Sequence, residues 1–326
     1  MEVRPRRATC GVSRRPIALA GRCLRLLRRR LRCREQLQAA SPHLRGSGIA
    51  RGGHVRESIR SPGMPQSRNP LVETKLETDR LHVRYGQTHA LKGVNLSVVA
   101  GTTLAIIGAG ASGKTTLLRC FNRLHDLDPS VRVEGSVKLD GAEVLGPRVD
   151  VRSLRRRVGM IFTQPTVLPG SVFDNVAFGL RAKGVRSQAE LEERCRAALQ
   201  RAMLWDRVSS MLRNPAPELP RELLQHLCVA RVLALDPEVL LLDDPTASLD
   251  PVSGLALEET ILALRRDHTV VLATNNLEQA ARLSDATCYV ANGEVVETGE
   301  TPHVFNRPTD TRTEDFLAGR SSNLPT

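Results

Sequence analysis

The sequence predicts an α/β fold: a mostly parallel sheet with a small antiparallel β subdomain and a helical subdomain beside it. Three observations favour this class. A glycine-rich loop at 108–115 joins a strand-like run to a helical segment, apolar runs at 239–242 and 269–273 are separated by helical stretches, and alternating segments precede the loop. Continuous apolar runs separated by helices are typical of buried parallel strands, whereas alternation indicates strands with one exposed face.

Short segments of alternating polarity predict the antiparallel subdomain. Leu81–Arg84 and Leu96–Val98 alternate apolar and polar side chains, as half-buried strands do. Val137–Leu139 runs into Asp140–Gly141, and later in the chain Asn292–Gly293 separates two more strand-like segments. Both dipeptides are turn signals, so each predicts a hairpin.

The loop at 108–115 has the residues of a phosphate-binding P-loop, which predicts a core of the P-loop NTPase (RecA-like) type. Thr103–Ile107 before it is a β-branched apolar run, and Thr115–Leu124 after it reads as a helix. Glycine lets successive backbone N–H groups turn inward, and the helix N-terminus adds positive dipole where phosphate oxygens bind. Lys114 is expected to reach the β- and γ-phosphates of ATP, and Thr115 to offer its hydroxyl to Mg²⁺. The residues predicted to bind ATP here are Gly108, Ala109, Gly110, Ala111, Ser112, Gly113, Lys114, Thr115 and Thr116.

A helical subdomain is predicted at about 165–235. Apolar residues recur at helical spacing between charged ones in 188–202, and 223–235 is a second candidate helix. The recurring apolar positions of the first segment are Leu191, Cys195, Ala198 and Leu199.

The net charge of +12 belongs to the first 63 residues. They hold 16 Arg, no Lys and 3 acidic residues, whereas the rest of the 326-residue chain has 31 basic and 32 acidic residues. The remainder is nearly neutral, so its charge gives no reason to expect a specific nucleic-acid partner. We expect 1–63 to be a disordered extension or the product of a start codon assigned upstream of Met64. Arg22–Arg34 also fits a basic amphipathic helix, and the Arg-rich start resembles an organellar transit peptide.

Cysteine usage and hydropathy exclude further classes. Seven cysteines without a Cys-x-x-Cys pair predict reduced thiols, not a disulfide framework or a zinc site. No run approaches 18 apolar residues, so any membrane role is expected to come through a partner.

Several motifs together resemble the ATP-binding subunit of ABC transporters, and in detail its phosphate-import (PstB-type) member. The general resemblance lies in Gly113-Lys114-Thr115, Leu242-Asp243 and Ser248-Leu249-Asp250-Pro251. The narrower one lies in Leu118-Arg119-Cys120-Phe121-Asn122-Arg123, Val133-Glu134-Gly135, Arg155-Arg156-Arg157-Val158-Gly159-Met160, Leu204-Trp205-Asp206 and Arg312-Thr313-Glu314-Asp315-Phe316. The resemblance spans about 70–320 and implies an ABC ATPase fold there, followed by a short tail at 321–326.

The resemblance implies roles for single residues and for partners. Tyr85 would stack on adenine, Asp243 would hold Mg²⁺ through water, and Asp250 would lie in a loop that crosses the interface between two subunits. The implied partners are a second ATP-binding subunit, in a homodimer or a heterodimer, and transmembrane permease subunits. The chain would therefore work at the cytoplasmic face of the cell membrane.

Two elements that bind or sense phosphate depart from the family pattern. Where the family has Gln after an Ile-Phe strand, this chain has Thr163 and then Gln164. Thr163 is too short to replace that reach, and Gln164 would point the other way if the strand continues. The Leu-Ser-Gly-Gly-Gln signature is replaced by Leu-Pro-Arg-Glu-Leu at 219–223. Its proline suits a first helical position but donates no N–H, and two charged side chains occupy the glycine positions, so we expect the helix to form and its phosphate contact to be lost.

Two catalytic positions depart as well. The family's Glu after the magnesium aspartate is Asp244 here, a carboxylate one methylene shorter that would serve as a weak general base. The family's switch histidine is Asn275, which donates a hydrogen bond but relays no proton. We therefore predict a subunit that binds ATP and Mg²⁺ and hydrolyses ATP poorly while driving phosphate import. The alternative is a catalytically weak or inactive regulatory or structural module, and a nucleic-acid-binding P-loop protein is a third reading that rests on the extension alone.

Overall fold

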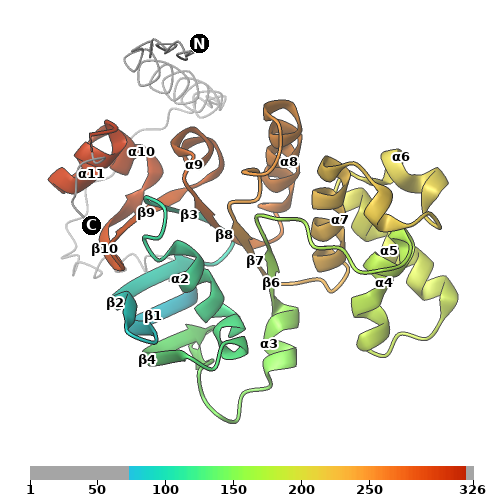
Figure 1. The fold of residues 1–326 in the computed structure, drawn as a ribbon, viewed down its shortest axis with the longest axis horizontal. Helices are drawn as coiled ribbons and strands as arrows, with labels where there is room; N and C mark the ends of the chain where they lie inside the picture. The colour runs from blue at the N-terminus through green and yellow to red at the C-terminus, as the bar shows by residue number, and fades with distance from the viewer. Residues whose placement is uncertain (1–72, 321–326) are drawn as a thin grey trace, which may run out of the picture. The chain divides into compact units, whose positions relative to one another are not determined.

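Residues 73–320 are described by the computed structural model and form two sheets with helices around and beside them (Figure 1). The four-stranded sheet has the order β2-β1-β4-β5, and the six-stranded sheet has the order β10-β9-β3-β8-β7-β6. The extension at 1–63 and the tail at 321–326 lie outside the described residues.

The four-stranded sheet is antiparallel and matches the predicted β subdomain. Its strands are β1 (Thr74–Tyr85), β2 (Thr88–Val99), β4 (Val131–Leu139) and β5 (Ala142–Glu143). Buried and more exposed residues alternate along much of β2, because one face of the sheet packs on the core and the other faces solvent. The predicted segments Leu81–Arg84 and Leu96–Val98 lie inside β1 and β2, and Asp140–Gly141 turns β4 into β5.

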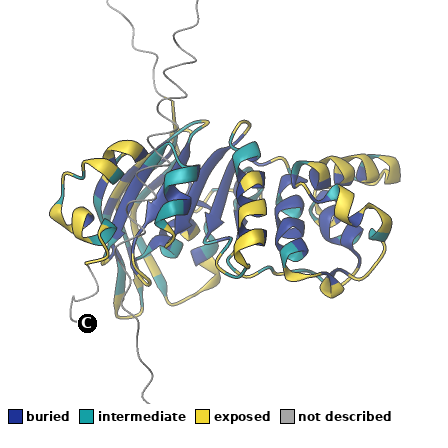
Figure 2. Ribbon diagram, turned by 90° about the horizontal axis from the view of Figure 1, so that it is seen from above, coloured by how far each residue is buried: buried dark blue, intermediate teal, exposed yellow. Residues whose placement is uncertain are grey.

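The six-stranded sheet confirms the predicted buried parallel strands. Its members are β3 (Thr103–Ile107), β6 (Val158–Ile161), β7 (Val239–Asp243), β8 (Thr269–Thr274), β9 (Ala286–Ala291) and β10 (Glu294–Glu300). All its neighbours pair in parallel except β9 and β10, which form the predicted hairpin around Asn292–Gly293. Figure 2 shows the parallel strands of this sheet in the buried colour, with helices beside them that carry exposed residues.

Alternation within the buried strands explains why they are apolar throughout. In β7, Leu240 and Leu242 pack in one hydrophobic cluster, whereas Val239 and Leu241 pack in another on the opposite face. The first cluster continues into the helical subdomain, and the second continues into the antiparallel sheet. Since successive side chains point to opposite faces, the side chains of a strand that is covered on both sides are buried and are therefore mainly apolar.

The helical group beside the sheet contains α4, α5, α6 and α7 (Figure 1). The α-helices (α) and 3-10 helices (η) of residues 73–320 are α2 (Lys114–Phe121), η1 (Leu124–Leu127), α3 (Val151–Arg157), α4 (Val172–Ala182), α5 (Gln188–Arg201), α6 (Trp205–Val208), η2 (Ser209–Met211), η3 (Ala216–Glu218), α7 (Arg221–Leu233), α8 (Pro251–Leu264), α9 (Leu277–Leu283), α10 (Thr301–Asn306) and α11 (Thr311–Leu317). The four apolar positions predicted for α5 are buried, as is Leu223 of α7. None of the helices within 73–320 is long and apolar enough to cross a membrane.

Helix boundaries follow local capping chemistry. Ser171 caps α4 in a capping box with Asp174, and Ser187 caps α5 through the Glu190 N–H. The helix predicted at Thr115–Leu124 begins one residue earlier and ends at Phe121, because the chain then turns into η1.

An ion-pair network ties the antiparallel sheet to the parallel one. Glu238 accepts two hydrogen bonds from Arg157, at 2.5 and 2.8 Å, and one from Lys75 at 2.5 Å. Asp140 pairs with the same two cations. The hydrogen bond from Arg157, with further stabilisation by Lys75, lowers the pKa of Glu238 to about 2. The network therefore fixes the start of β7 against β1 and against the last residue of α3.

Candidate nucleotide site

The glycines of the loop at 108–115 are required by close backbone contacts. A Cβ on Gly108 would lie 2.2 Å from the Val290 carbonyl oxygen, and a Cβ on Gly113 would lie 2.8 Å from Leu91 Cδ2 and 2.9 Å from the Ala90 carbonyl oxygen. Gly113 also has a φ of 109°, in the region that favours glycine. The loop backbone therefore lies so close to β2 and β9 that no side chain fits at Gly108 or Gly113.

Backbone donors of this loop are open to a ligand. Among residues 73–320, the N–H groups of Gly110, Ala111 and Gly113 donate to no protein acceptor. Gly110 and Ala111 are exposed. Since α2 begins at Lys114, its N-terminal dipole points at the same place, so the loop fits an anionic phosphate chain.

Lys114 supplies a cation inside this loop. Its Nζ donates at 2.8 Å to the carbonyl oxygens of both Gly108 and Ala109, and the side chain is buried. Burial lowers the pKa of Lys114, and the nearby carboxylates of Asp244 and Asp243 oppose that shift. The ammonium group is thus desolvated beside two negative charges, which is where a phosphate could compete for it.

Thr115 and Asp243 meet across the site. The Thr115 hydroxyl donates to Asp243 Oδ1 at 2.8 Å, and Asp243 is buried at the end of β7. Burial raises the pKa of Asp243, while the Thr115 hydrogen bond and the charge of Arg119 oppose the shift. No group of three or more His, Cys, Asp or Glu residues within 73–320 is arranged to hold a metal by itself. The hydroxyl and carboxylate therefore fit a Mg²⁺ ion that takes its remaining ligands from phosphate and water.

Asp244 and Asn275 also lie together. Asn275 Nδ2 is 3.4 Å from Asp244 Oδ2, and the Thr274 hydroxyl is 3.4 Å from Asp244 Oδ1. Asp244 has a φ of 45°, in the left-handed region that aspartate adopts more readily than most other residues. Burial raises its pKa, which the Thr274 hydrogen bond opposes. The two long hydrogen bonds leave the carboxylate loosely held, close enough to Lys114 for the two charges to interact.

The segment after β6 places Thr163 and Gln164 in different directions, although the strand does not continue to them. The strand ends at Ile161, so the strand alternation used to orient Gln164 does not extend that far. The Thr163 hydroxyl donates to the Asp243 carbonyl oxygen at 2.8 Å, and the Gln164 side chain accepts a hydrogen bond from Arg221. Thr163 therefore lies at the site and Gln164 lies away from it, toward α7.

The start of α7 is bonded within its own chain. Pro220 precedes the first helical residue and makes no side-chain cap, so it occupies the N-cap position and not the predicted first helical position. Glu222 accepts from Arg207 at 2.7 Å and from the Ser253 hydroxyl at 2.8 Å. Arg207 and then Ser253 lower the pKa of Glu222. The helix forms as predicted, with charged side chains engaged by neighbours in the same chain.

Three predicted residues lie at the margin of this arrangement. Asp250 caps α8, since its side chain accepts from the N–H groups of Val252 and Ser253. Tyr85 ends β1 half-buried, at the hairpin whose second strand contacts Gly113. Thr116 lies half-buried in the first turn of α2.

Sequence reasoning left out two residues that touch this site. Thr274 bonds Asp244, and the Ser248 hydroxyl donates to the Thr163 carbonyl oxygen at 3.0 Å. A signal existed for both, because Thr274 follows the apolar run at 269–273 and Ser248 stands in the motif that carries the family resemblance.

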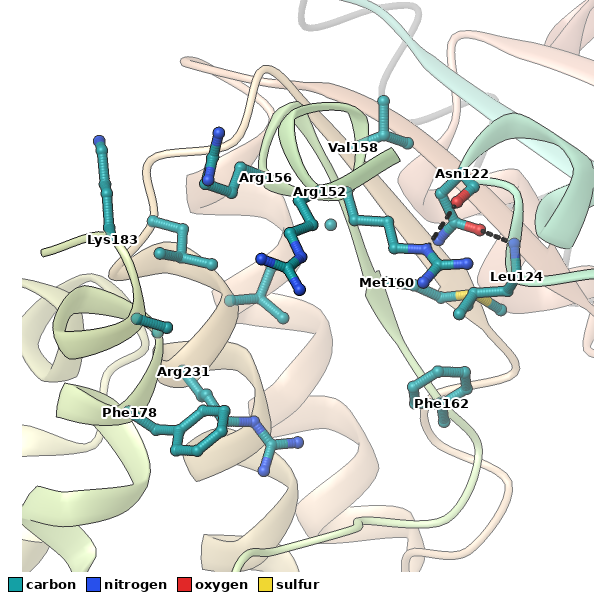
Figure 3. A pocket seen from close by; sticks show the side chains of 16 residues that line it. Asn122, Leu124, Arg152, Arg156, Val158, Met160, Phe162, Phe178, Lys183 and Arg231 are labelled. Carbon is teal, nitrogen blue, oxygen red and sulfur yellow. Dashed lines mark hydrogen bonds between the residues drawn. The ribbon is translucent and has the colours of Figure 1, made fainter. Parts of the chain in front are cut away.

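A basic groove separates the core from the helical subdomain (Figure 3). Its volume is about 650 Å³, and its walls come from α3, β6, α4 and α7. Met160, Phe162 and Phe178 give it apolar surface, and its lining residues within the described part of the chain include no acidic one. The side chains of Arg152, Arg156 and Lys183 line it without a hydrogen bond or ion pair to any residue in 73–320.

The fold and the site define a P-loop nucleotide-binding domain with an added antiparallel sheet and a helical subdomain. Residues 91–247 match the sequence profile of the ABC transporter family. The chain is 43% identical over 263 residues to phosphate import ATP-binding protein PstB 1 of Gloeobacter violaceus, covering 80% of this chain and 98% of that protein. CbiO1 of Clostridium perfringens, described as part of the ABC transporter complex CbiONQ, superposes with a TM-score of 0.64 at 27% identity, covering 74% of this chain and 95% of that one.

The chain belongs to the family of ABC transporter ATP-binding proteins, which are P-loop ATPases. The predicted fold is confirmed, and ATP is the nucleotide that the family binds.

Proposed function

We propose that this chain is the ATP-binding subunit of an importer for inorganic phosphate. The observation that carries the proposal is the Thr115–Asp243 pair beside Lys114. The pair offers ligands for Mg²⁺, and Lys114 offers a positive charge for phosphate at the same place. Its similarity to a phosphate import protein over nearly that protein's whole length supports the choice of cargo.

The residues at the site have separable tasks. The loop N–H groups and Lys114 bind the phosphates, and Thr115 with Asp243 holds Mg²⁺, which supplies positive charge to the transferred phosphoryl group. Asp244 accepts the proton of the attacking water, and Asn275 donates a hydrogen bond to the γ-phosphate. Tyr85 stacks on the adenine.

We propose that this subunit hydrolyses ATP slowly. Asp244 is one methylene shorter than glutamate, and a misplacement of about 1 Å can cost roughly 100-fold in rate. Its only side-chain partners within 73–320, Thr274 and Asn275, lie at 3.4 Å and do little to orient it. The second candidate, a regulatory or structural module that binds ATP without useful turnover, is favoured by the engagement of Arg221 and Glu222 inside their own chain.

The proposed partners are a second ATP-binding subunit and transmembrane permease subunits. The basic groove is the proposed docking site for the permease, at the cytoplasmic face of the membrane. Arg152, Arg156 and Lys183, which have no partner within 73–320, lie beside two exposed phenylalanines. This surface fits a segment that is both acidic and apolar, since each cation would gain a carboxylate as the rings are covered. Asp250 lies in the loop proposed to face the second subunit.

ATP turnover by the full chain, with Lys114→Ala as the control, tests the proposed function. Slow turnover that disappears in Lys114→Ala is the expected result. Turnover at the same rate in both proteins would contradict the proposal, and ATP binding with no turnover by the full chain would favour the module. For the cargo, cells lacking this subunit should take up less radiolabelled phosphate, and equal uptake would contradict phosphate as the cargo.

A further inference from the structure

The three residues that follow β6 are held from two sides. On the α7 side, Arg221 donates to the Gln164 side chain, and Gln225 Nε2 donates to the Phe162 carbonyl oxygen at 2.9 Å. Arg221 and Gln225 are four residues apart and so share one face of α7. The outer two residues of the segment are thus bonded to one helix.

The middle residue is bonded to the nucleotide core instead. Thr163 donates its hydroxyl to the Asp243 carbonyl oxygen at 2.8 Å and accepts at its own carbonyl from Ser248 at 3.0 Å. Asp243 is the residue whose carboxylate meets Thr115. A short chain of hydrogen bonds therefore runs from α7 through 162–164 to the proposed magnesium site.

Gln225 gives an independent sign that this connection is built into the fold. Its side chain is fully buried, and its Oε1 finds no hydrogen-bond partner among the described residues. A buried amide that uses its nitrogen and leaves its oxygen unpaired costs stability, so packing alone does not account for it. What the Gln225 side-chain amide adds to the structure is its hydrogen bond to the Phe162 carbonyl oxygen, which joins α7 to the segment after β6.

We propose that Arg221 is a positioning residue for the ATP site: through Gln164 it holds Thr163 on Asp243, so that the start of α7 and the nucleotide site of the same chain are coupled. This rests on the proposed function only in that the chain binds ATP. Arg221 stands at a position where the family pattern has glycine, and Gln164 stands one residue beyond the family's glutamine. The two substitutions act as a pair, and neither touches the nucleotide.

Binding of a fluorescent ATP analogue with Mg²⁺ to the full chain tests the coupling through a double-mutant cycle. Arg221→Gln and Gln164→Leu should each weaken binding by roughly 3-fold to 10-fold, the range of one net hydrogen bond. The double variant should be no weaker than the weaker single variant, because both remove one interaction. Arg221→Lys should recover part of the loss, and Arg186→Gln, which changes the same charge on an exposed residue of the helical subdomain, should bind like the unaltered protein. Unaltered affinity in Arg221→Gln, or losses that multiply in the double variant, would overturn the proposal.

Hydrogen exchange without nucleotide separates this proposal from the proposed function. Arg221→Gln should speed exchange in 162–164 and at Asp244, whose N–H is bonded to Ala273 at 2.8 Å, whereas Arg186→Gln should not. Unchanged exchange there would overturn the coupling even if ATP binds normally. Equal binding of nucleotide by the unaltered protein and by Lys114→Ala would contradict the proposed function, while the exchange result would still decide the coupling.

Discussion

The loop at 108–115 and the start of α7 at 219–223 stand at the two places where the family pattern has phosphate-binding segments, yet they differ in what holds them. The loop is confined by backbone contacts, since a side chain on Gly113 would collide with the neighbouring strand. The start of α7 is open, and its exposed Arg221 and half-exposed Glu222 bond to residues of their own chain. The comparison teaches that the phosphate-binding loop has little freedom to change, whereas the start of α7, which remains exposed, is bonded to side chains of its own chain.

Within the nucleotide site, the residues proposed for binding and those proposed for hydrolysis also differ in how firmly hydrogen bonds hold them. The Thr115 hydroxyl donates to Asp243 at 2.8 Å, and Lys114 donates at 2.8 Å to the carbonyl oxygen of Gly108 in the loop. Asp244 and Asn275 beside them are joined only at 3.4 Å. Binding and turnover should therefore respond to different substitutions.

The largest expected effect is a gain of turnover on lengthening the base. Asp244→Glu should raise ATP turnover by up to about 100-fold, because the added methylene moves the carboxylate toward the attacking water by about the distance that costs this factor. Steady-state phosphate release measures it, and Asp267→Glu, the same change at an exposed residue, should have no effect. Unchanged turnover in Asp244→Glu would place the limitation at the start of α7.

The next effect concerns binding at the loop. Lys114→Ala should weaken Mg-ATP binding by about 10-fold to 100-fold, the range for a hydrogen bond to a charged group. Isothermal titration calorimetry measures the dissociation constant. Lys138→Ala, which removes a half-buried lysine paired with Glu77, is the matched control, and equal losses in the two variants would show that the ammonium of Lys114 is not the phosphate ligand.

Sequence reasoning succeeded where local structure follows from neighbouring residues in the chain. The strand at 103–107, the loop and the helix after it are consecutive, so their pattern predicts the geometry. The hairpin turns at Asp140–Gly141 and Asn292–Gly293 were found for the same reason. Such local signals need no knowledge of what packs beside them.

It failed where a side chain's partner is distant. Strand alternation gave a direction for Gln164 only if the strand continued, and β6 ends three residues earlier; Gln164 does lie away from the site, but its partner Arg221 is 57 positions along the chain and no local pattern marks it. The pairing of Lys75 with Glu238 spans 163 positions, and no local pattern marks it. The basic groove escaped notice because α3, α4 and α7 supply it from separate parts of the chain.

A smaller effect, on stability, tests the anchoring of the core that carries the loop. Glu238→Gln should lower the free energy of unfolding at pH 7 by about 1 kcal/mol, a value reduced for the partial exposure of this ion pair. The folded-state pKa of about 2 lies below the ordinary value of 4.5, so the stabilisation is complete above about pH 5 and is lost as the pH falls toward 2. Urea unfolding at several pH values measures both, with Glu193→Gln, an exposed residue of α5, as the control. A difference between the two variants that persists undiminished at pH 2 would contradict the role of the carboxylate.

The smallest expected effect distinguishes a contact at the start of α7 that only stabilises the fold from one that also affects Mg-ATP binding. The Ser253 hydroxyl lies 2.8 Å from Glu222 and 2.5 Å from Asp250, and its one proton can be donated to either carboxylate. Ser253→Ala should lower the free energy of unfolding by about 0.5–1 kcal/mol through the lost hydrogen bond. It should leave Mg-ATP affinity unchanged, because this contact leads to α8 and not to Asp243. Ser209→Ala, at an exposed serine, should change neither quantity. Weaker Mg-ATP binding in Ser253→Ala would mean that the start of α7 reaches the nucleotide site by a second path, through Asp250, and that Arg221 is not its only connection.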